Sequence, residues 1–150
     1  MTTNHLIRDF READFPKIAE LWGWLDLGSP KRGDNAAVIL RSLDHGGIFL
    51  VMEAVPSGEI IGTSWMTNDS RRIYLHHFGI APASQRQGLG KALLQASLGR
   101  AKATGLQIKL EVHRDNQAAI ALYRSFGFAR LGDYDSYIIR DLNGIPSGAK

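Results

Sequence analysis

The chain has 150 residues, of which 44% are hydrophobic, and a formal net charge of +3 at pH 7. This size and composition fit one globular domain with an ordinary core and argue against a second domain. The positive excess is too small for a nucleic-acid-binding surface. The absence of cysteine excludes disulfides, thiolate zinc sites and a cysteine nucleophile.

The hydropathy pattern gives no sign of a membrane protein. No stretch approaches the roughly 18 uninterrupted apolar residues that a membrane span needs. The N-terminus, "MTTNHLIRDFREADF", lacks the apolar core of a signal peptide. We therefore expect a cytoplasmic protein with no membrane partner.

The first half of the chain predicts an antiparallel sheet with two helices. Residues 5–10 alternate between apolar and polar, as in a strand, and Asp14 and Pro16 suit the start of a helix. Turn residues then separate three apolar runs, which favours three successive strands. The predicted elements are a strand at 5–10, helices at 11–25 and 35–43, and strands at 48–54, 59–67 and 72–82.

The second half changes period after Gly88. Leu89, Ala92, Leu93 and Ala96 share one helical face, and alternation returns in the segment "LQIKLEVH". The predicted elements are a helix from 88 to about 104, a strand at 106–113, a helix at 117–126, and strands at 128–131 and 135–142. Together they predict an α/β (α+β) domain over 1–142, with about four helices flanking a mixed, mostly antiparallel sheet of six to seven strands, and a loose tail at 143–150.

The stretch "SQRQGLGKALLQA" opens a helix with two glycines, each costing roughly 1 kcal/mol against alanine. A helix that follows a strand presents unpaired N–H groups and the positive end of its dipole. Gly88 and Gly90 lack Cβ atoms, so a phosphate group can approach these donors, and Arg86 and Lys91 add positive charge. The segment predicts an anion site, unless the glycines only permit close strand–helix packing.

Two common phosphate-binding motifs do not fit this segment. In a P-loop the first glycine and the hydroxyl residue would stand where Gln85 and Ala92 are. A dinucleotide fingerprint would need a third glycine where Leu93 stands. Nucleotide hydrolysis and dinucleotide binding are therefore disfavoured.

The pattern Gln85-x-x-Gly88-x-Gly90 after a strand resembles the pyrophosphate loop of the GNAT superfamily of acetyl-CoA-dependent N-acyltransferases. A second segment, "DNQAAIALYRSFGF", resembles that superfamily's signature of an Asn near a helix start followed by Leu-Tyr and Gly-Phe. Both segments are most similar to the ribosomal-protein alanine N-acetyltransferases, which acetylate a protein N-terminus. The resemblance implies a GNAT-type fold and transfer of acetyl from acetyl-CoA to a primary amine, on a small molecule or a protein N-terminus, by direct attack in a ternary complex.

The resemblance also assigns roles to residues. Glu111 is the implied general base, and Tyr123 is the implied acid for the departing thiolate. The implied cofactor-binding residues are Phe78, Gly79, Ile80, Gln85, Arg86, Gln87, Gly88, Leu89, Gly90, Lys91 and Asn116. Of these, the backbone of residues 78–80 would pair with the pantetheine arm.

Each assignment has an alternative. Glu111 is equally explained as a solvated strand carboxylate. Tyr123 is explained as a core aromatic residue, and Asn116 as a helix cap. His76 or His77 is an alternative base. Neighbouring strand residues point to opposite faces, so the two histidines are not expected to bind a metal together.

The competing function is an acyl-CoA sensor without turnover. No nucleic-acid partner is expected, and a homodimer is an assembly to test.

Overall fold

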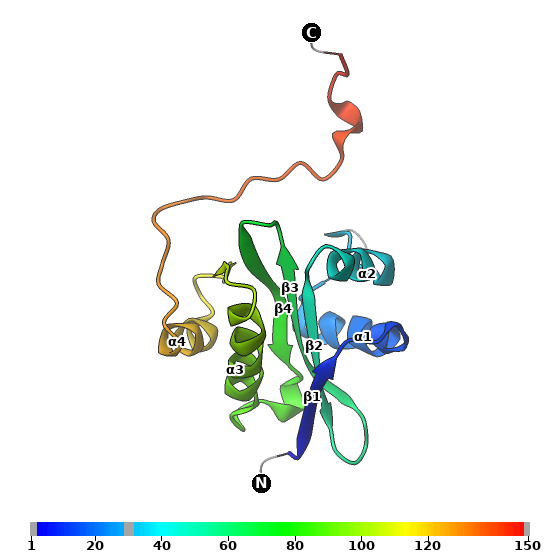
Figure 1. Ribbon diagram of the computed structural model, residues 1–150, viewed down its shortest axis with the longest axis vertical. Coiled ribbons are helices and arrows are strands. Elements are labelled where there is room, and N and C mark those ends of the chain that lie inside the picture. The colour runs from blue at the N-terminus through cyan, green and yellow to red at the C-terminus, as the bar shows by residue number, and fades with distance from the viewer. Residues whose placement is uncertain (1–2, 29–31, 149–150) are drawn as a thin grey trace.

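The computed structural model describes residues 3–28 and 32–148, and a five-stranded sheet forms the centre of the molecule (Figure 1). The strands are β1 (His5–Asp9), β2 (Ile48–Ala54), β3 (Ile60–Asn68), β4 (Arg72–Ile80) and β5 (Gln107–Leu110). They lie side by side in chain order. The first four are antiparallel, and β4 pairs with β5 in parallel. The mixed, mostly antiparallel sheet is confirmed.

Helices cover both faces of this sheet. The helical elements in the described residues are η1 (Glu12–Asp14), α1 (Phe15–Leu25), α2 (Ala36–Asp44), η3 (Pro82–Ser84), α3 (Leu89–Lys102), α4 (Gln117–Ser125) and η4 (Leu142–Gly144). Figure 1 shows α1 and α2 on one face, and α3 and α4 on the other. None of the helices in residues 3–28 and 32–148 is long and apolar enough to cross a membrane.

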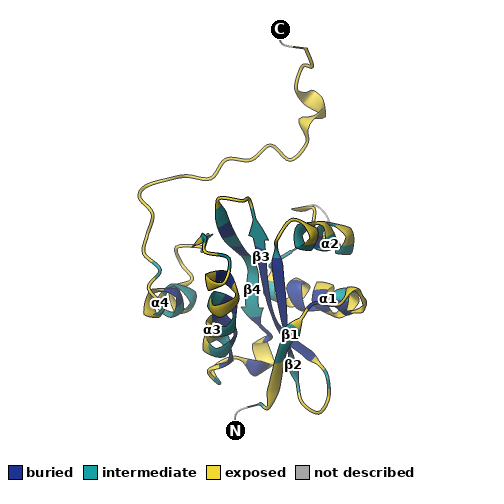
Figure 2. Cartoon of the chain, viewed as in Figure 1, coloured by how far each residue is buried: buried dark blue, intermediate teal, exposed yellow. Residues whose placement is uncertain are grey.

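The core lies along β2 and β3, which are buried over most of their length (Figure 2). Three consecutive β3 residues bind one helix each. The Trp22 indole N–H of α1 donates to the Thr63 hydroxyl at 2.9 Å. The Ser97 hydroxyl of α3 donates to Ser64 at 2.7 Å, and the Trp65 indole donates to Ser42 of α2 at 2.9 Å. The central strand is therefore tied to helices on both faces.

Asp14 has a different role from the expected helix cap. It precedes α1, but its carboxylate forms no capping bond with that helix. It instead accepts hydrogen bonds from the Arg8 guanidinium at 2.8 and 2.9 Å, and one from the Arg11 N–H. Arg8 also donates to Glu53 of β2 at 2.8 Å. These half-buried charges join β1, β2 and the start of α1, and the Arg8 hydrogen bond lowers the pKa of Asp14.

The predicted strand count of six to seven was too high, because the residues described after α4, up to 148, form no strand. Residues 129–148 are all exposed and run from α4 past the end of the β3–β4 hairpin, away from the sheet (Figures 1 and 2). They include both segments predicted as strands beyond Phe128. A strand needs a neighbouring strand for its backbone hydrogen bonds, and the sequence pattern does not supply that partner.

The Thr63 hydroxyl accepts from Trp22 and donates to the His77 carbonyl at 2.8 Å. Thr63→Val keeps the shape but leaves both buried partners without this bond, so the free energy of unfolding should fall by about 1–3 kcal/mol. Urea denaturation measures this change. Thr63→Ser retains the hydroxyl and serves as the control; equal stability of Thr63→Val and the wild type would contradict a structural role for the bridge.

Candidate functional site

The β4 and β5 strands pair over only part of their length. Residues 72–75 of β4 pair with 107–110 of β5, and β4 then continues to Ile80 without a described partner on that side. On its other side β4 remains paired with β3, for example Thr63 with Gly79. Phe78, Gly79 and Ile80 therefore lie where the two parallel strands separate, on the part of β4 that has no described strand on that side.

A bulge in β4 accompanies the separation. The β3–β4 register shifts between Thr63 and Trp65, opposite His77. His77 has a φ of 44°, in the left-handed region that non-glycine residues rarely adopt. The Thr63 hydroxyl binds the carbonyl of this residue. A bulge bends its strand, which gives a physical reason for β4 to leave β5.

The loop after β4 leads into the N-terminus of α3. Gln85 donates from its side-chain amide to the Ile80 carbonyl at 2.9 Å, which ties the loop to the end of β4. Gln87 accepts from the Thr3 N–H at 2.7 Å and from the Thr3 hydroxyl at 2.9 Å. Both glutamines thus hold the loop in place by contacts within the protein.

Gly88 occupies the N-cap position of α3 with a φ of 78° and has no side chain to bond the first helical N–H groups. Arg86, two residues earlier, also has a left-handed φ, of 63°. Arg86, Gly88 and Lys91 are exposed, whereas the Leu89 side chain is buried in the core. The first turn of α3 therefore offers backbone donors and two nearby cations to solvent, as an anion site requires.

The second predicted motif lies beside the same strand. Tyr123 of α4 is buried, and its ring is 6.0 Å from that of Phe78 and 5.7 Å from that of Phe128. Burial raises the pKa of its hydroxyl to about 12. Asn116 caps α4 by accepting from the Ala119 N–H at 3.2 Å, so its capping role is confirmed.

Glu111 directly follows β5, which ends at Leu110, three residues before the end of the predicted strand. Extending the β4–β5 register places it beside His76. The Tyr74 ring stacks on His76 at 4.2 Å, and the Thr67 hydroxyl lies 2.8 Å from His76 Nε2. Ser136 donates to the Glu111 carboxylate at 3.2 Å. We call Glu111, His76, Tyr74 and Thr67 the polar cluster.

The titratable neighbours of Glu111 are held uncharged. Burial, reinforced by the neighbouring His77, lowers the pKa of His76 to about 4. Burial and the adjacent Glu111 carboxylate raise the pKa of Tyr74 well above its ordinary value. Glu111 is the member of the polar cluster that is exposed to solvent, whereas the other three are half-buried.

His77 occupies a separate, enclosed position. Its ring centroid is 4.4 Å from that of Trp22 and 5.1 Å from that of Trp65. Asp34 Oδ2 lies 3.2 Å from Nε2, but neither ring nitrogen makes an aligned hydrogen bond with the described residues. Asp34 and His77 therefore form a close polar contact without an aligned hydrogen bond between them. Burial lowers the pKa of His77 even though Asp34 opposes the shift.

The expectation that the two histidines point to opposite faces was wrong. Both rings contact Trp65, on the side of the sheet that α2 covers, and their centroids are 6.3 Å apart. The bulge at His77 breaks the alternation on which the expectation depended. Even so, the described parts of the chain bring no three His, Cys, Asp or Glu side chains together as metal ligands.

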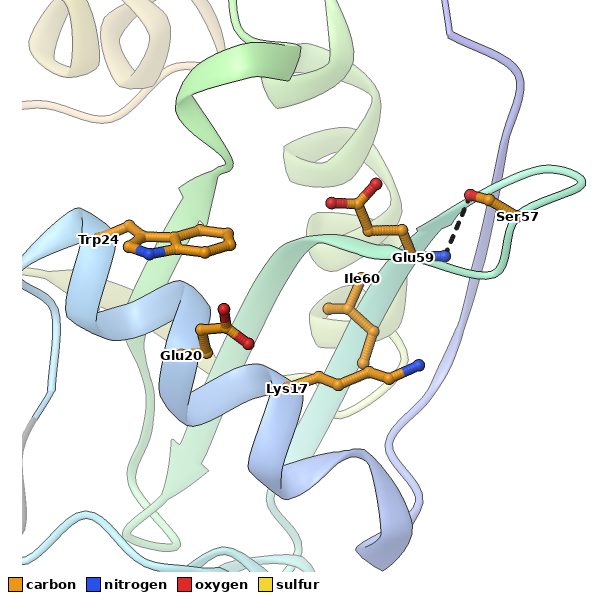
Figure 3. Close-up of a pocket in the computed structure, with 6 residues that line it drawn as sticks. All are labelled: Lys17, Glu20, Trp24, Ser57, Glu59 and Ile60. Atoms are coloured by element: carbon orange, nitrogen blue, oxygen red, sulfur yellow. Dashed lines mark hydrogen bonds between the residues drawn. The ribbon is translucent and has the colours of Figure 1, made fainter.

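Figure 3 shows a hollow of about 280 Å³ elsewhere on the molecule, between α1 and the turn that joins β2 to β3. It is lined by Lys17, Glu20, Trp24, Ser57, Glu59 and Ile60. All of these except Ile60 are exposed, and none belongs to the predicted site. The hollow is a surface depression outside the candidate site.

The sequence profile of the Acetyltransferase (GNAT) family matches residues 4–128. The chain belongs to this family. GNAT acetyltransferases use acetyl-CoA and act on amine acceptors. The match includes both predicted motifs and ends where the exposed C-terminal segment begins.

Solved structures show the same fold at low sequence identity. A GNAT-family acetyltransferase from Staphylococcus aureus superposes with a TM-score of 0.76 at 17% identity, covering 85% of this chain and 84% of that one. The ribosomal-protein-S18-alanine N-acetyltransferase of Escherichia coli gives 0.71 at 22%, covering 85% and 79%. The glucosamine-6-phosphate N-acetyltransferase of Arabidopsis thaliana gives 0.70 at 19%, covering 90% and 98%.

The sequence analysis missed several residues that shape the site. Thr63, Trp22, Asp34 and Tyr74 reach it only through the fold, from positions distant in the chain. No local motif marks them. The aromatic and polar residues of "GTSWMT" were a usable signal, because polar side chains within a buried strand need partners.

Proposed function

We propose that the protein is an N-acetyltransferase that moves an acetyl group from acetyl-CoA to a primary amine of a small molecule or a protein N-terminus, by direct attack in a ternary complex. The main support is that the separation of β4 from β5 leads directly into the uncapped N-terminus of α3. The extended thioester arm of acetyl-CoA would lie along the unpaired part of β4, and its phosphates would lie at the N-terminus of α3. When bound, acetyl-CoA supplies the activated acetyl group.

Backbone groups and charges would hold the donor. Residues 78–80 offer an edge of β4 that β5 does not cover, suitable for hydrogen bonds to an extended amide chain. The loop from Gln85 to Lys91 offers the helix N-terminus and two cations for the pyrophosphate. Asn116 stands at the start of α4, and Tyr123 from that helix contacts the ring of Phe78.

Glu111 is the base that the environment favours. An α-amine has a pKa of about 8 and a lysine one of about 10.4, so an acceptor amine must lose a proton before attack. The His76 ring is half-buried between Tyr74 and Thr67, and His77 is enclosed by two tryptophans, so both imidazoles are less accessible than Glu111. The Glu111 carboxyl group is exposed, so it could accept the proton and pass it to solvent.

Tyr123 is the proposed acid for the departing thiolate. Burial keeps its hydroxyl protonated at neutral pH, and an ordinary thiol has a pKa of about 8.5. Because a pKa of about 12 lies above that of an ordinary thiol, the transfer is uphill, and Tyr123 would give its proton only to a fully formed thiolate, which is the strongest base that the leaving group becomes. Its contact with Phe78 places it against the strand that would hold the thioester.

The enzymatic proposal is tested by release of free thiol from acetyl-CoA with a panel of amines. The panel includes amino sugars and peptides with free N-termini, because the named relatives have acceptors of both kinds. CoA binding without thiol release for any acceptor would favour an acyl-CoA sensor. If the protein neither binds CoA nor releases thiol with any acceptor, the proposal is refuted.

Gly90→Ala separates ligand access from packing. A Cβ at Gly90 would meet Leu122 at 3.6 Å, an ordinary contact, so the protein should fold and gain up to about 1 kcal/mol of helix stability. The same methyl group should weaken CoA binding about tenfold or more, because it would lie 3.9 Å from Ile80, where the end of β4 meets the N-terminus of α3 and the donor would pass. Calorimetry measures the affinity, and thermal unfolding measures the stability.

Gly99→Ala, in the same helix, is the matched control. A Cβ at Gly99 meets nothing within 4 Å. It should stabilise the protein without changing CoA affinity. If Gly90→Ala binds CoA normally, the glycine at this position serves strand–helix packing and not ligand access. Gly88 is a poorer probe, because its φ of 78° strains any other residue.

Tyr123→Phe removes one hydroxyl and little volume. If the hydroxyl protonates the leaving thiolate, kcat should fall by about 10²- to 10⁴-fold with little change in CoA affinity. Steady-state kinetics and calorimetry separate the two effects. An unchanged kcat would make Tyr123 a core aromatic residue only.

Glu111→Gln keeps the size of the side chain and removes the base. The rate at neutral pH should fall by about 10²-fold or more, while CoA binding persists. The rate should recover as the pH approaches the pKa of the acceptor, about 8 for an N-terminus and about 10 for lysine, since a free amine needs no base. A wild-type rate and pH profile would refute the assignment and point to His76 or His77.

A further inference from the structure

The segment that leads into β1 contacts the loop that leads into α3, although the two are 84 residues apart in the sequence. The Thr3 N–H donates to Gln87 Oε1 at 2.7 Å, and the Thr3 hydroxyl donates to the same oxygen at 2.9 Å. Both residues are half-buried, whereas Asn4, Arg86 and Gly88 beside them are exposed. The contact is therefore a specific one between two otherwise solvated segments.

The sheet holds Thr3 in place. β1 begins at His5, which pairs with Ala54 of β2. One residue earlier, the Asn4 carbonyl accepts from the Val55 N–H at 2.9 Å. Figure 1 shows the start of β1 and the loop before α3 at the same end of the molecule. Thr3 thus reaches the loop from a backbone that the sheet has already fixed.

The donors of Thr3 determine which way round the Gln87 amide lies. A backbone N–H group can only donate, so the side-chain atom that faces it must be the amide oxygen. With both Thr3 donors on Oε1, the two acceptor positions of that oxygen are filled. The Gln87 amide nitrogen makes no hydrogen bond with the described residues 3–28 and 32–148. Its two N–H donors are therefore available to a ligand.

The loop around Gln87 has a backbone that other contacts must hold. Arg86 and Gly88, on either side of it, have φ values of 63° and 78°, both left-handed. For Arg86 this conformation is unfavourable, and such residues persist where the surrounding structure imposes them. Gln85 ties one side of this turn to the end of β4, and Gln87 ties the other side to Thr3. The turn is thus held at both ends.

We propose that Thr3 is a positioning residue for the acetyl donor. By fixing the Gln87 oxygen, it holds the turn before α3 in the form that receives the pyrophosphate, and it leaves the Gln87 amide N–H groups as further donors to that anion. Thr3 acts through Gln87 and not by contact with the donor. This role rests on the proposed function, because it takes the N-terminus of α3 as the pyrophosphate site.

Preorganisation of the turn is the physical gain. A loop that becomes ordered only when its ligand binds loses part of the binding free energy to that ordering. A site built from backbone N–H groups is especially sensitive, because its donors converge in one backbone conformation only. A turn that Thr3 already holds avoids this loss. Affinity for CoA should therefore depend on Thr3, whereas the turnover of bound donor should not.

Calorimetry with CoA and three Thr3 variants tests this role. Thr3→Val removes the hydroxyl and should weaken CoA binding about threefold, and Thr3→Pro removes both donors and should weaken it about tenfold. Thr3→Ser keeps both donors and should bind CoA as the wild type does. Asn4→Ala is the matched control, because the exposed Asn4 side chain makes no hydrogen bond in the described part of the chain. Wild-type affinity for CoA in Thr3→Pro would overturn the proposal.

A donor without phosphates separates positioning from a general loss of structure. S-acetylpantetheine carries the thioester arm but no pyrophosphate. With an amine acceptor from the panel, Thr3→Pro should lower kcat/KM for acetyl-CoA about tenfold, through KM, and leave kcat/KM for S-acetylpantetheine unchanged. An equal loss with both donors would show that Thr3 only supports the fold, and would overturn the proposal.

The double variant Thr3→Pro/Gln87→Met tests whether Thr3 acts through Gln87. Methionine has the length of glutamine but no amide group, so the Thr3 substitution should cost no further CoA affinity in this background. Additive losses would contradict the positioning role. A wild type that does not bind CoA would refute the proposed function as well. If the wild type binds CoA and Thr3→Pro binds it equally, the positioning role alone is wrong.

Discussion

The hydroxyl of Thr63 joins the two features on which the candidate site depends. It accepts from the Trp22 indole of α1 and donates to the His77 carbonyl in the bulge of β4. The bulge needs this bond because the shifted register removes a regular sheet partner. The bent strand pairs with β5 over four residues only, so residues 78–80 of β4 have no described strand on that side. One buried hydroxyl thus connects helix packing to the opening in the sheet.

The same bulge gives the two histidines different surroundings. His76 lies with Tyr74, Thr67 and Glu111 at the β5 side, whereas His77 lies between two tryptophans near Asp34. Burial lowers the pKa of both imidazoles, so neither carries a charge at neutral pH. The exposed Glu111 carboxyl group lies beside these uncharged rings, and it is the base in the proposed mechanism. Proton transfer would then occur at the solvent-facing side.

The two faces of the sheet have different roles in the proposed enzyme. The α3 and α4 face supplies the helix N-terminus, the cap at Asn116 and the Tyr123 hydroxyl, all on the donor side. The α1 and α2 face supplies the polar cluster and the enclosed His77. The family match covers these parts and ends at Phe128.

The sequence by itself determined the parts of the structure that local physics controls. Periodicity and turn residues located four helices and the first five strands, because burial of one face leaves a repeat in the sequence. The two motifs identified the family, and Asn116 was found as a cap. The roles of Glu111, Tyr123 and the loop residues stay predictions.

Only the tertiary structure decided what depends on partners distant in the chain. The bulge at His77 arises from the β3–β4 register and from Thr63, fourteen residues earlier, which no alternation pattern records. Because of this bulge, the rings of His76 and His77 lie on the same face of the sheet and not on opposite faces as expected. The final strands failed for a related reason: residues 128–131 and 135–142 carry the patterns of strands, but a strand also needs backbone hydrogen bonds to a neighbouring strand, and the described residues after α4 make none.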